Sequence, residues 1–205
     1  MNKIKSSPAF SIVLIFSLMV FSISCTGGVP TLNEAVNYPL APEEIRSSVQ
    51  KTLEGEEFKI SEREGKVLLL NFWATWCMPC IEEMPDLVKL QKELGPKGFE
   101  ILGMNTQAMS LEDEGLTFEE LELQVKEIIK TQKLNYEVVW SSSEAYEKTA
   151  ELANMPVVPL SLLIDADGKV VAVFKGGGKE TLNKIIDMSR RAVEDHNTKK
   201  AEVKN

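Results

Sequence analysis

The chain has 205 residues, 43% of them hydrophobic and 26% charged, which is normal for one folded domain with an appendage. Its formal net charge of −8 makes it a poor partner for phosphate backbones, so we expect no nucleic-acid binding. A lone histidine, His196, and three cysteines exclude most histidine-based metal sites and any dense disulfide framework. We expect no metal and, without a flavin or nicotinamide motif, no cofactor, which leaves sulfur chemistry.

Residues 1–24 have the layout of a secretory signal. Two lysines precede an apolar run over residues 10–23, shorter than the roughly 20 residues that a membrane-spanning helix needs. Cleavage after Ser24 would leave Cys25 at the mature N-terminus, which resembles a bacterial lipoprotein whose N-terminal cysteine carries lipid. Ser22 stands where that pattern usually has Leu. The alternatives are an uncleaved anchor and a plain secreted protein, and each of the three places the domain outside the cytoplasm. The lipoprotein, which we expect, would be held in the cell envelope.

Residues 25–52 are rich in glycine and proline and predict a tether with one short helix after Pro42. A short strand is expected at residues 58–60, and a nearly continuous apolar strand follows at residues 67–73. Such a run is typical of a strand that is covered on both faces.

Residues 77–94 predict a helix that ends at a Gly-Pro break, and residues 99–105 a second apolar strand. Strand, helix and strand in this order imply a parallel crossover. An acidic segment then contains a helical insertion, with apolar residues at helical spacing over residues 117–132.

A strand at residues 136–140 and a helix at residues 143–152 with a serine cap come next. The chain continues with an antiparallel hairpin of strands 160–164 and 170–174, and with a helix at residues 179–194 after three glycines. Residues 197–205 are expected to be a frayed polar tail. The predicted domain, residues 53–196, is of the α/β class: a central mixed sheet flanked by helices, with a helical insertion and an N-terminal strand extension.

Cys77 and Cys80 directly follow the buried strand and open the predicted helix, a context more informative than their spacing alone. In the first turn of a helix they lie on nearly one face, so a disulfide can form and break without refolding. Cys77 lies at the positive end of the helix dipole, which stabilises a thiolate and predicts the nucleophile. Cys80, expected to be more shielded, would then attack the mixed disulfide. A structural disulfide or half of a zinc site is disfavoured, because so short a loop adds little stability and two further ligands are lacking.

The stretch Gly65–Cys80, followed by Glu82-Glu83-Met84-Pro85, resembles the active-site region of the TlpA/ResA-like family of membrane-tethered, thioredoxin-fold thiol–disulfide oxidoreductases. The resemblance extends through Met155–Pro159 and covers about residues 52–196. It implies a thioredoxin-like fold. The chain departs from the family pattern at Val157, at Leu160-Ser161-Leu162, and in a longer acidic segment from Leu111 to Glu122; these departures concern the choice of partner rather than the fold.

This resemblance also implies several site residues. Pro159 would be a cis-proline facing the disulfide, and the backbone of Val158 would pair with an extended substrate segment. From the residues alone, a trans proline that opens a strand would be the usual interpretation. Met78 and Pro79 form the active-site loop between the cysteines, and Trp76 is expected to present a flat apolar surface to partners.

Asn71 stands where thioredoxins place a buried Asp that handles the proton of the resolving thiol. An amide cannot titrate, so another base is needed. Glu83 lies one turn beyond Cys80 on the same helix side, and in ResA-like relatives a Glu at this place belongs to the active site. The alternatives are that Glu82 has this role or that Glu83 is only a solvent-facing acid.

The resemblance implies an exported reductant of disulfides in other envelope proteins, with apocytochrome c as the family's best-known kind of substrate and a membrane thiol as electron donor. A disulfide-forming oxidase stays open, because direction depends on the reduction potential. A peroxiredoxin-like peroxidase is disfavoured, since the proline of its P-x-x-x-T-x-x-C signature is missing before Thr75. A copper chaperone would require a wider cysteine spacing and a nearby histidine.

Overall fold

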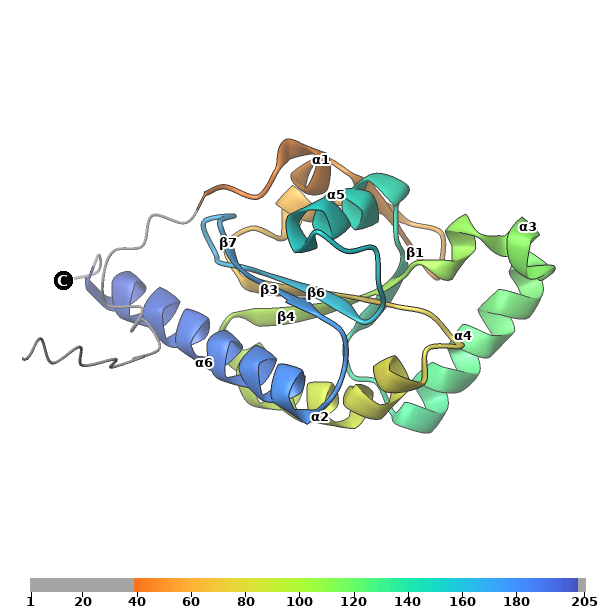
Figure 1. Ribbon diagram of the computed structural model, residues 1–205. Coiled ribbons are helices and arrows are strands. Elements are labelled where there is room, and N and C mark those ends of the chain that lie inside the picture. The colour runs from red at the N-terminus through yellow and green to blue at the C-terminus, as the bar shows by residue number, and fades with distance from the viewer. Residues whose placement is uncertain (1–38, 203–205) are drawn as a thin grey trace, which may run out of the picture. The chain divides into compact units, whose positions relative to one another are not determined.

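A seven-stranded sheet in the order β2-β1-β5-β4-β3-β6-β7 organises the computed structural model, which describes residues 39–202 (Figure 1). The strands are β1 (Val49–Thr52), β2 (Glu57–Lys59), β3 (Val67–Trp73), β4 (Phe99–Asn105), β5 (Glu137–Trp140), β6 (Leu160–Ile164) and β7 (Val170–Lys175). The α-helices are α1 (Glu43–Arg46), α2 (Met78–Leu94), α3 (Leu111–Glu114), α4 (Phe118–Gln132), α5 (Ser143–Ala153) and α6 (Lys179–Glu202), and the 3-10 helices are η1 (Ile60–Arg63), η2 (Gly95–Lys97) and η3 (Gln107–Met109).

The two apolar runs of the sequence form the middle of the sheet. All residues of β3 and β4 are buried, and the two strands pair in parallel across the crossover helix α2. On its other side β3 pairs antiparallel with β6, and β6 and β7 form the expected hairpin. The predicted α/β class, a mixed sheet flanked by helices, is therefore confirmed.

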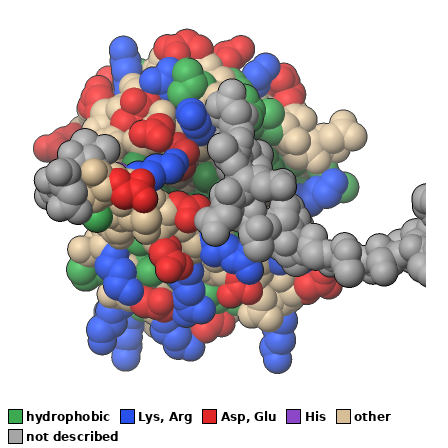
Figure 2. All heavy atoms as spheres, turned by 90° about the vertical axis from the view of Figure 1, so that its left-hand side faces the viewer, with side chains coloured by type: hydrophobic (Ala, Val, Ile, Leu, Met, Phe, Trp, Pro, Cys, Tyr) green, Lys and Arg blue, Asp and Glu red, His purple; other side chains and the backbone are tan. Residues whose placement is uncertain are grey.

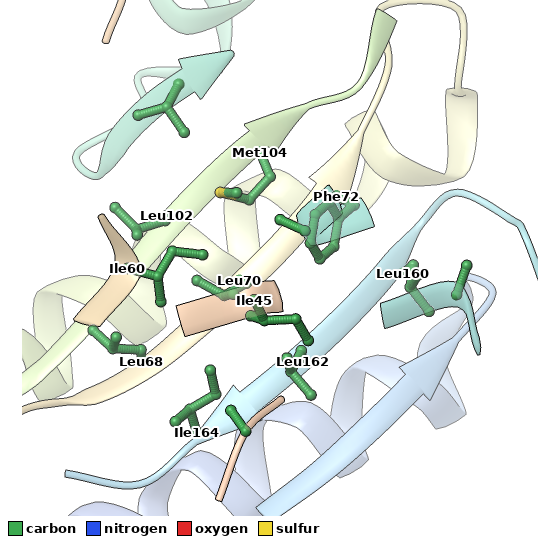
Figure 3. Packing of buried hydrophobic residues seen from close by; sticks show 14 of the residues in the cluster. Ile45, Ile60, Leu68, Leu70, Phe72, Leu102, Met104, Leu160, Leu162 and Ile164 are labelled. Carbon is green, nitrogen blue, oxygen red and sulfur yellow. The ribbon is translucent and has the colours of Figure 1, made fainter. Parts of the chain in front are cut away.

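Helices cover both faces of the sheet: α1 and α5 lie over one face, and α2 and α6 over the other (Figure 1). Successive side chains of a strand point to opposite faces. The even-numbered residues of β3, Leu68, Leu70 and Phe72, accordingly pack in the core under α1 and α5, where Figure 3 shows them beside Ile45 and Ile60.

The odd-numbered residues of β3 face α2 and α6. Val67 and Leu69 pack there with apolar residues of both helices. Trp73, at the end of the strand, belongs to a third cluster that includes the two cysteines and residues of α4. By this alternation Asn71 lies between the sheet and α2, six residues before Cys77 in the chain.

The sequence predicts that the folded domain starts at residue 53, but the structure shows that it begins earlier. The helix expected after Pro42 is present as α1, and the last residues of the predicted tether form β1, which pairs with β2 and β5. The buried side chains of this strand are the polar Gln50 and Thr52. Gln50 is satisfied by hydrogen bonds to Ser48 and Ser142, and a strand of this kind has no apolar pattern to reveal it.

The chain joins the sheet at the end that lies away from the cysteines. Leu40 forms a β-bridge with Lys169, and the backbone N–H of Ala41 donates to Gly168 at 2.8 Å. These contacts lie beside the carboxyl end of β6, which pairs with the amino end of β3. Cys77 follows the opposite, carboxyl end of β3. Residues 1–38, with the predicted signal sequence and Cys25, lie outside the described part of the chain.

Helix α6 runs on to Glu202, so the segment from residue 197 is helical up to that point rather than frayed. The residues of this last part are polar, so the sequence has no apolar pattern there that would predict a helix. Asn197 attaches it to the domain by donating a hydrogen bond to the carbonyl of Lys97 at 3.1 Å. Earlier in the helix, Arg190 makes a two-point ion pair with Glu93 of α2. Charged groups of both signs are interspersed over the face in Figure 2. Among residues 39–202, none of the helices combines the length and hydrophobicity that a membrane span requires.

Candidate active site

The cysteine pair lies at the start of α2. Cys77 is the N-cap residue and Cys80 lies in the first turn, and a disulfide joins them with a Cα–Cα distance of 5.3 Å. The N–H of Cys77 donates to the carbonyl of Ala74 at 3.1 Å, so the chain turns tightly from β3 into the helix. The two sulfur atoms thus lie at the positive end of a 17-residue helix.

Exposure does not distinguish the two cysteines in the disulfide form. Cys77 is 3% exposed and Cys80 is 1% exposed, whereas the sequence predicted a more accessible Cys77. Their places in the helix do differ, because the N-cap precedes the first-turn N–H groups and Cys80 lies among them. The neighbours of Cys77 in the chain, Trp76 and Met78, are 61% and 63% exposed and form the accessible surface beside it.

Glu83 is a buried acid, only 3% exposed, one turn beyond Cys80 on α2. Its Oε1 accepts a hydrogen bond of 2.8 Å from Nδ2 of Asn71. The same Nδ2 donates to the hydroxyl of Ser161 at 3.0 Å. Glu82, the other acid considered from the sequence, is exposed to solvent, so burial separates the two.

The strand register explains how Asn71 meets its partners. Asn71 pairs with Ser161 of β6 on one side and with Gly103 of β4 on the other. A β-carbon on Gly103 would lie 3.2 Å from the ring of Tyr136 and 3.4 Å from Nε1 of Trp73, so these aromatic side chains fill the space beside Asn71. From the sequence Ser161 stands out only as a departure from the family pattern, because the pairing of distant antiparallel strands cannot be read from one sequence.

Burial raises the pKa of Glu83 to about 7, and the hydrogen bond from Asn71 opposes this rise. The pKa of the Tyr136 phenol is also raised, first by burial and then by the negative charge of Glu83. Among the described residues the hydroxyl of Tyr136 has no hydrogen-bond partner. A carboxyl group with such a pKa can take up and return a proton near neutral pH, which the amide of Asn71 cannot do.

Three segments meet around the active-site loop. The peptide bond between Val158 and Pro159 is cis, and the carbonyl of Pro159 accepts a hydrogen bond from the N–H of Gly176 at 2.9 Å. A β-carbon on Gly177 would lie 2.7 Å from Cβ of Pro79 and 3.4 Å from Cγ of Pro159. Gly177 is therefore in contact with both prolines, and no side chain fits there. In the sequence the three glycines predict only a lead into α6, and nothing in it indicates this contact.

Comparison with known proteins agrees with this geometry. The Redoxin family model matches residues 31–188. The thiol-disulfide oxidoreductase ResA of Bacillus thuringiensis subsp. konkukian is 32% identical over 133 residues, which cover 65% of this chain and 68% of that protein. ResA of Halalkalibacterium halodurans is 31% identical over 142 residues, covering 69% of this chain and 72% of that protein.

The fold is shared with a solved structure as well. The crystal structure of a thiol:disulfide interchange protein of the thioredoxin family from Chlorobium tepidum superposes with a TM-score of 0.59 at 28% identity, covering 76% of this chain and 97% of that one. The thioredoxin-like fold predicted from the sequence is confirmed. With a Cys-x-x-Cys pair at a helix N-terminus and relatives of this kind, the chain belongs to the Redoxin family and is a thiol–disulfide oxidoreductase of the ResA/TlpA-like type.

Proposed function

We propose that the protein is an exported reductant, which reduces disulfides of other envelope proteins through Cys77 and Cys80. The observation that carries this proposal is the buried carboxyl group of Glu83 one turn from Cys80. When ionised, it disfavours a second negative charge on the nearby thiol. A strong oxidant instead stabilises its reduced, thiolate form, so this carboxylate favours the opposite direction of electron flow.

In the first step, the Cys77 thiolate attacks one sulfur of the substrate disulfide. A bond forms between Cys77 and the substrate, the substrate disulfide breaks, and the released substrate thiolate takes a proton from water. Helix α2 favours the thiolate because its unpaired N–H groups and its dipole are directed at the N-cap position of Cys77.

In the second step, the thiol of Cys80 gives its proton to Glu83 and attacks the Cys77 sulfur. The mixed disulfide breaks, the Cys77–Cys80 disulfide forms, and the second substrate sulfur leaves as a thiolate, which takes a proton from water. Two electrons have passed from the protein to the substrate. A membrane thiol of the same envelope must return them, since the chain carries no flavin or nicotinamide motif.

The substrate is expected to lie along the cis-proline segment. The backbone of Val158 would pair with an extended chain, Pro159 lacks an N–H that would compete with it, and Trp76 offers an exposed apolar face. Oxidised apocytochrome c, with two cysteines in a short C-x-x-C-H segment, is the substrate that we propose, on the strength of the similarity to ResA.

The proposal predicts a low reduction potential for the Cys77–Cys80 pair. Equilibrated in defined thiol/disulfide buffers, the purified protein is expected to show a midpoint nearer to about −270 mV, typical of thioredoxin, than to about −120 mV, typical of the oxidant DsbA. The reduced protein should also reduce an oxidised C-x-x-C-H peptide stoichiometrically. A midpoint near that of DsbA would favour the disulfide-forming oxidase, and rapid turnover of hydrogen peroxide would favour a peroxidase.

We also propose that Cys25 anchors the protein to the envelope by a lipid on the mature N-terminus. Replacing Cys25 with Ser is expected to move the mature protein from the membrane fraction to the soluble fraction, because the lipid then has no attachment site. Cell fractionation and labelling with a fatty-acid analogue measure this. Wild-type protein that takes up no label would contradict the anchor and leave the redox proposal intact.

A further inference from the structure

The segment between β4 and α4, here named the insertion arm (residues 107–117), contacts the loop that carries Cys77. Its first residue, Gln107, is 2% exposed. Oε1 of Gln107 accepts a hydrogen bond from the backbone N–H of Thr75 at 3.0 Å and lies 2.8 Å from the Thr75 hydroxyl. The arm also packs apolar side chains against the cluster that contains both cysteines. The arm includes part of the acidic segment in which this chain departs from the family pattern. That segment therefore contacts the active site.

Glu114, the last residue of α3, joins the arm to Trp76. Its Oε1 accepts a hydrogen bond from the indole N–H of Trp76 at 3.3 Å and another from the hydroxyl of Ser110 at 2.9 Å. Its Oε2 accepts a hydrogen bond from the side-chain amide of Gln107. Both oxygens of the carboxylate therefore have donors. The indole, which can only donate, is held by an acceptor that the arm itself keeps in place.

Burial does not hold Trp76, because the side chain is 61% exposed. A side chain so exposed exchanges among rotamers in nanoseconds unless a specific contact fixes it. Binding a partner to a mobile indole costs the entropy of immobilising it, and a fixed indole avoids that cost. The contact with Glu114 can thus strengthen the binding of a partner, although one exposed hydrogen bond adds little to the stability of the fold.

We propose that Glu114 is a positioning residue for substrate recognition, which holds Trp76 in the orientation that an incoming protein disulfide meets. This inference rests on the proposed function, since it concerns docking of a polypeptide at Cys77. The substrate class that fits is a polypeptide disulfide with an apolar residue beside the attacked cysteine, because that residue packs on the indole face. A small disulfide that reaches Cys77 without lying on Trp76 does not depend on the arm.

The test compares two oxidants with reduced full-length protein: a synthetic oxidised C-x-x-C-H peptide with leucine beside the first cysteine, and DTNB. For Glu114→Ala, the ratio of the peptide to the DTNB second-order rate constant is expected to fall roughly three- to tenfold, the effect of one side chain left mobile. Fluorescence anisotropy decay should gain a fast component, because Trp76 becomes mobile while Trp73 and Trp140 stay buried. Glu119→Ala, a neighbouring exposed acid at the start of α4, is the matched control and should alter neither quantity.

A double-mutant cycle distinguishes positioning from charge. Trp76→Phe lacks the N–H donor, so adding Glu114→Ala to it should not lower the peptide rate further. An equal loss in both backgrounds would show that Glu114 acts through its charge and would overturn the proposal, as would an unchanged anisotropy decay in Glu114→Ala. If the wild-type protein reacts with DTNB but not with the peptide, the proposed function fails, and the anisotropy measurement still decides whether Glu114 holds Trp76.

Discussion

Replacing Glu83 with Gln is expected to slow the resolution of the Cys77 mixed disulfide by about 10²-fold near pH 7.5, since general-base catalysis is typically of this size or larger. In the proposed mechanism the carboxyl group, whose pKa burial raises to about 7, accepts the proton of Cys80. The rate should therefore rise with pH through about 7 as Glu83 ionises. In the variant this rise is expected to move to the higher pH at which the thiol loses its proton without a neighbouring base.

Stopped-flow kinetics with DTNB measures this step directly. One equivalent of DTNB places a thionitrobenzoate group on Cys77, and the second release of thionitrobenzoate reports the attack by Cys80. Gln retains an oxygen that can accept the hydrogen bond from Asn71, so the packing around α2 is preserved. Glu82→Gln is the matched control because Glu82 is exposed on the same helix turn. Identical pH profiles for wild type and Glu83→Gln would exclude Glu83 as the base.

The stability of the oxidised protein should report the same carboxyl group independently. The pKa of Glu83 is about 7 in the folded protein and about 4.5 in the unfolded chain, so between these values the folded state binds more protons. The stability contributed by this group is therefore greatest below about pH 4.5 and decreases as the pH rises to about 7. Above pH 7, Glu83→Gln should be more stable than wild type by up to about 3 kcal/mol, and this advantage should vanish near pH 4.5. Urea unfolding at several pH values measures the difference.

Removing either cysteine is expected to stop turnover, and the two variants should stop it at different steps. Cys80→Ala should accumulate a stable mixed disulfide between Cys77 and substrate, because the first attack proceeds and the second has no thiol. Cys77→Ala should form none, since Cys80 lies inside the first turn of α2, past the N-cap position that Cys77 occupies. Non-reducing electrophoresis and mass mapping distinguish these outcomes.

A brief alkylation pulse on the reduced wild-type protein provides a check without mutation. Label is expected first on Cys77, because the N-cap position of α2 places its sulfur at the positive end of the helix dipole, which favours the reactive thiolate. Predominant early labelling of Cys80 would reverse the assignment of nucleophile and resolving thiol, and the mixed disulfide would then be trapped by the other variant.

The elements that the sequence predicted well are those in which burial follows a simple pattern. β3 and β4 are continuous apolar runs, and α4 has apolar residues at helical spacing, of which Leu121 and Val125 are buried. β1 was missed because its buried residues are polar, and the end of α6 because its residues are polar and exposed. In both cases side-chain hydrogen bonds with distant residues replace the apolar pattern that sequence reasoning depends on.

The reactive residues of the candidate site were predictable from the sequence, whereas several contacts between its segments were not. The positions of Cys77, Cys80 and Glu83 follow from spacing on one helix, which is local information. The contact of Asn71 with Ser161 depends on the register of β3 against β6, about 90 residues later in the chain. The contact of Gly177 with Pro79 depends likewise on where α6 begins relative to α2. Such pairings arise from tertiary packing and leave no local signal.

The bridge between Leu40 and Lys169 bears on how the domain would work from a surface. The chain joins the domain at the end of the sheet opposite the cysteines, so an anchor upstream would leave Cys77 on the side that points away from the attachment. The 14 residues from Cys25 to residue 39 reach at most about 50 Å when fully extended. A lipid on Cys25 would thus keep residue 39 within that distance of the membrane, while the cysteine pair lies at the opposite end of the sheet from this attachment.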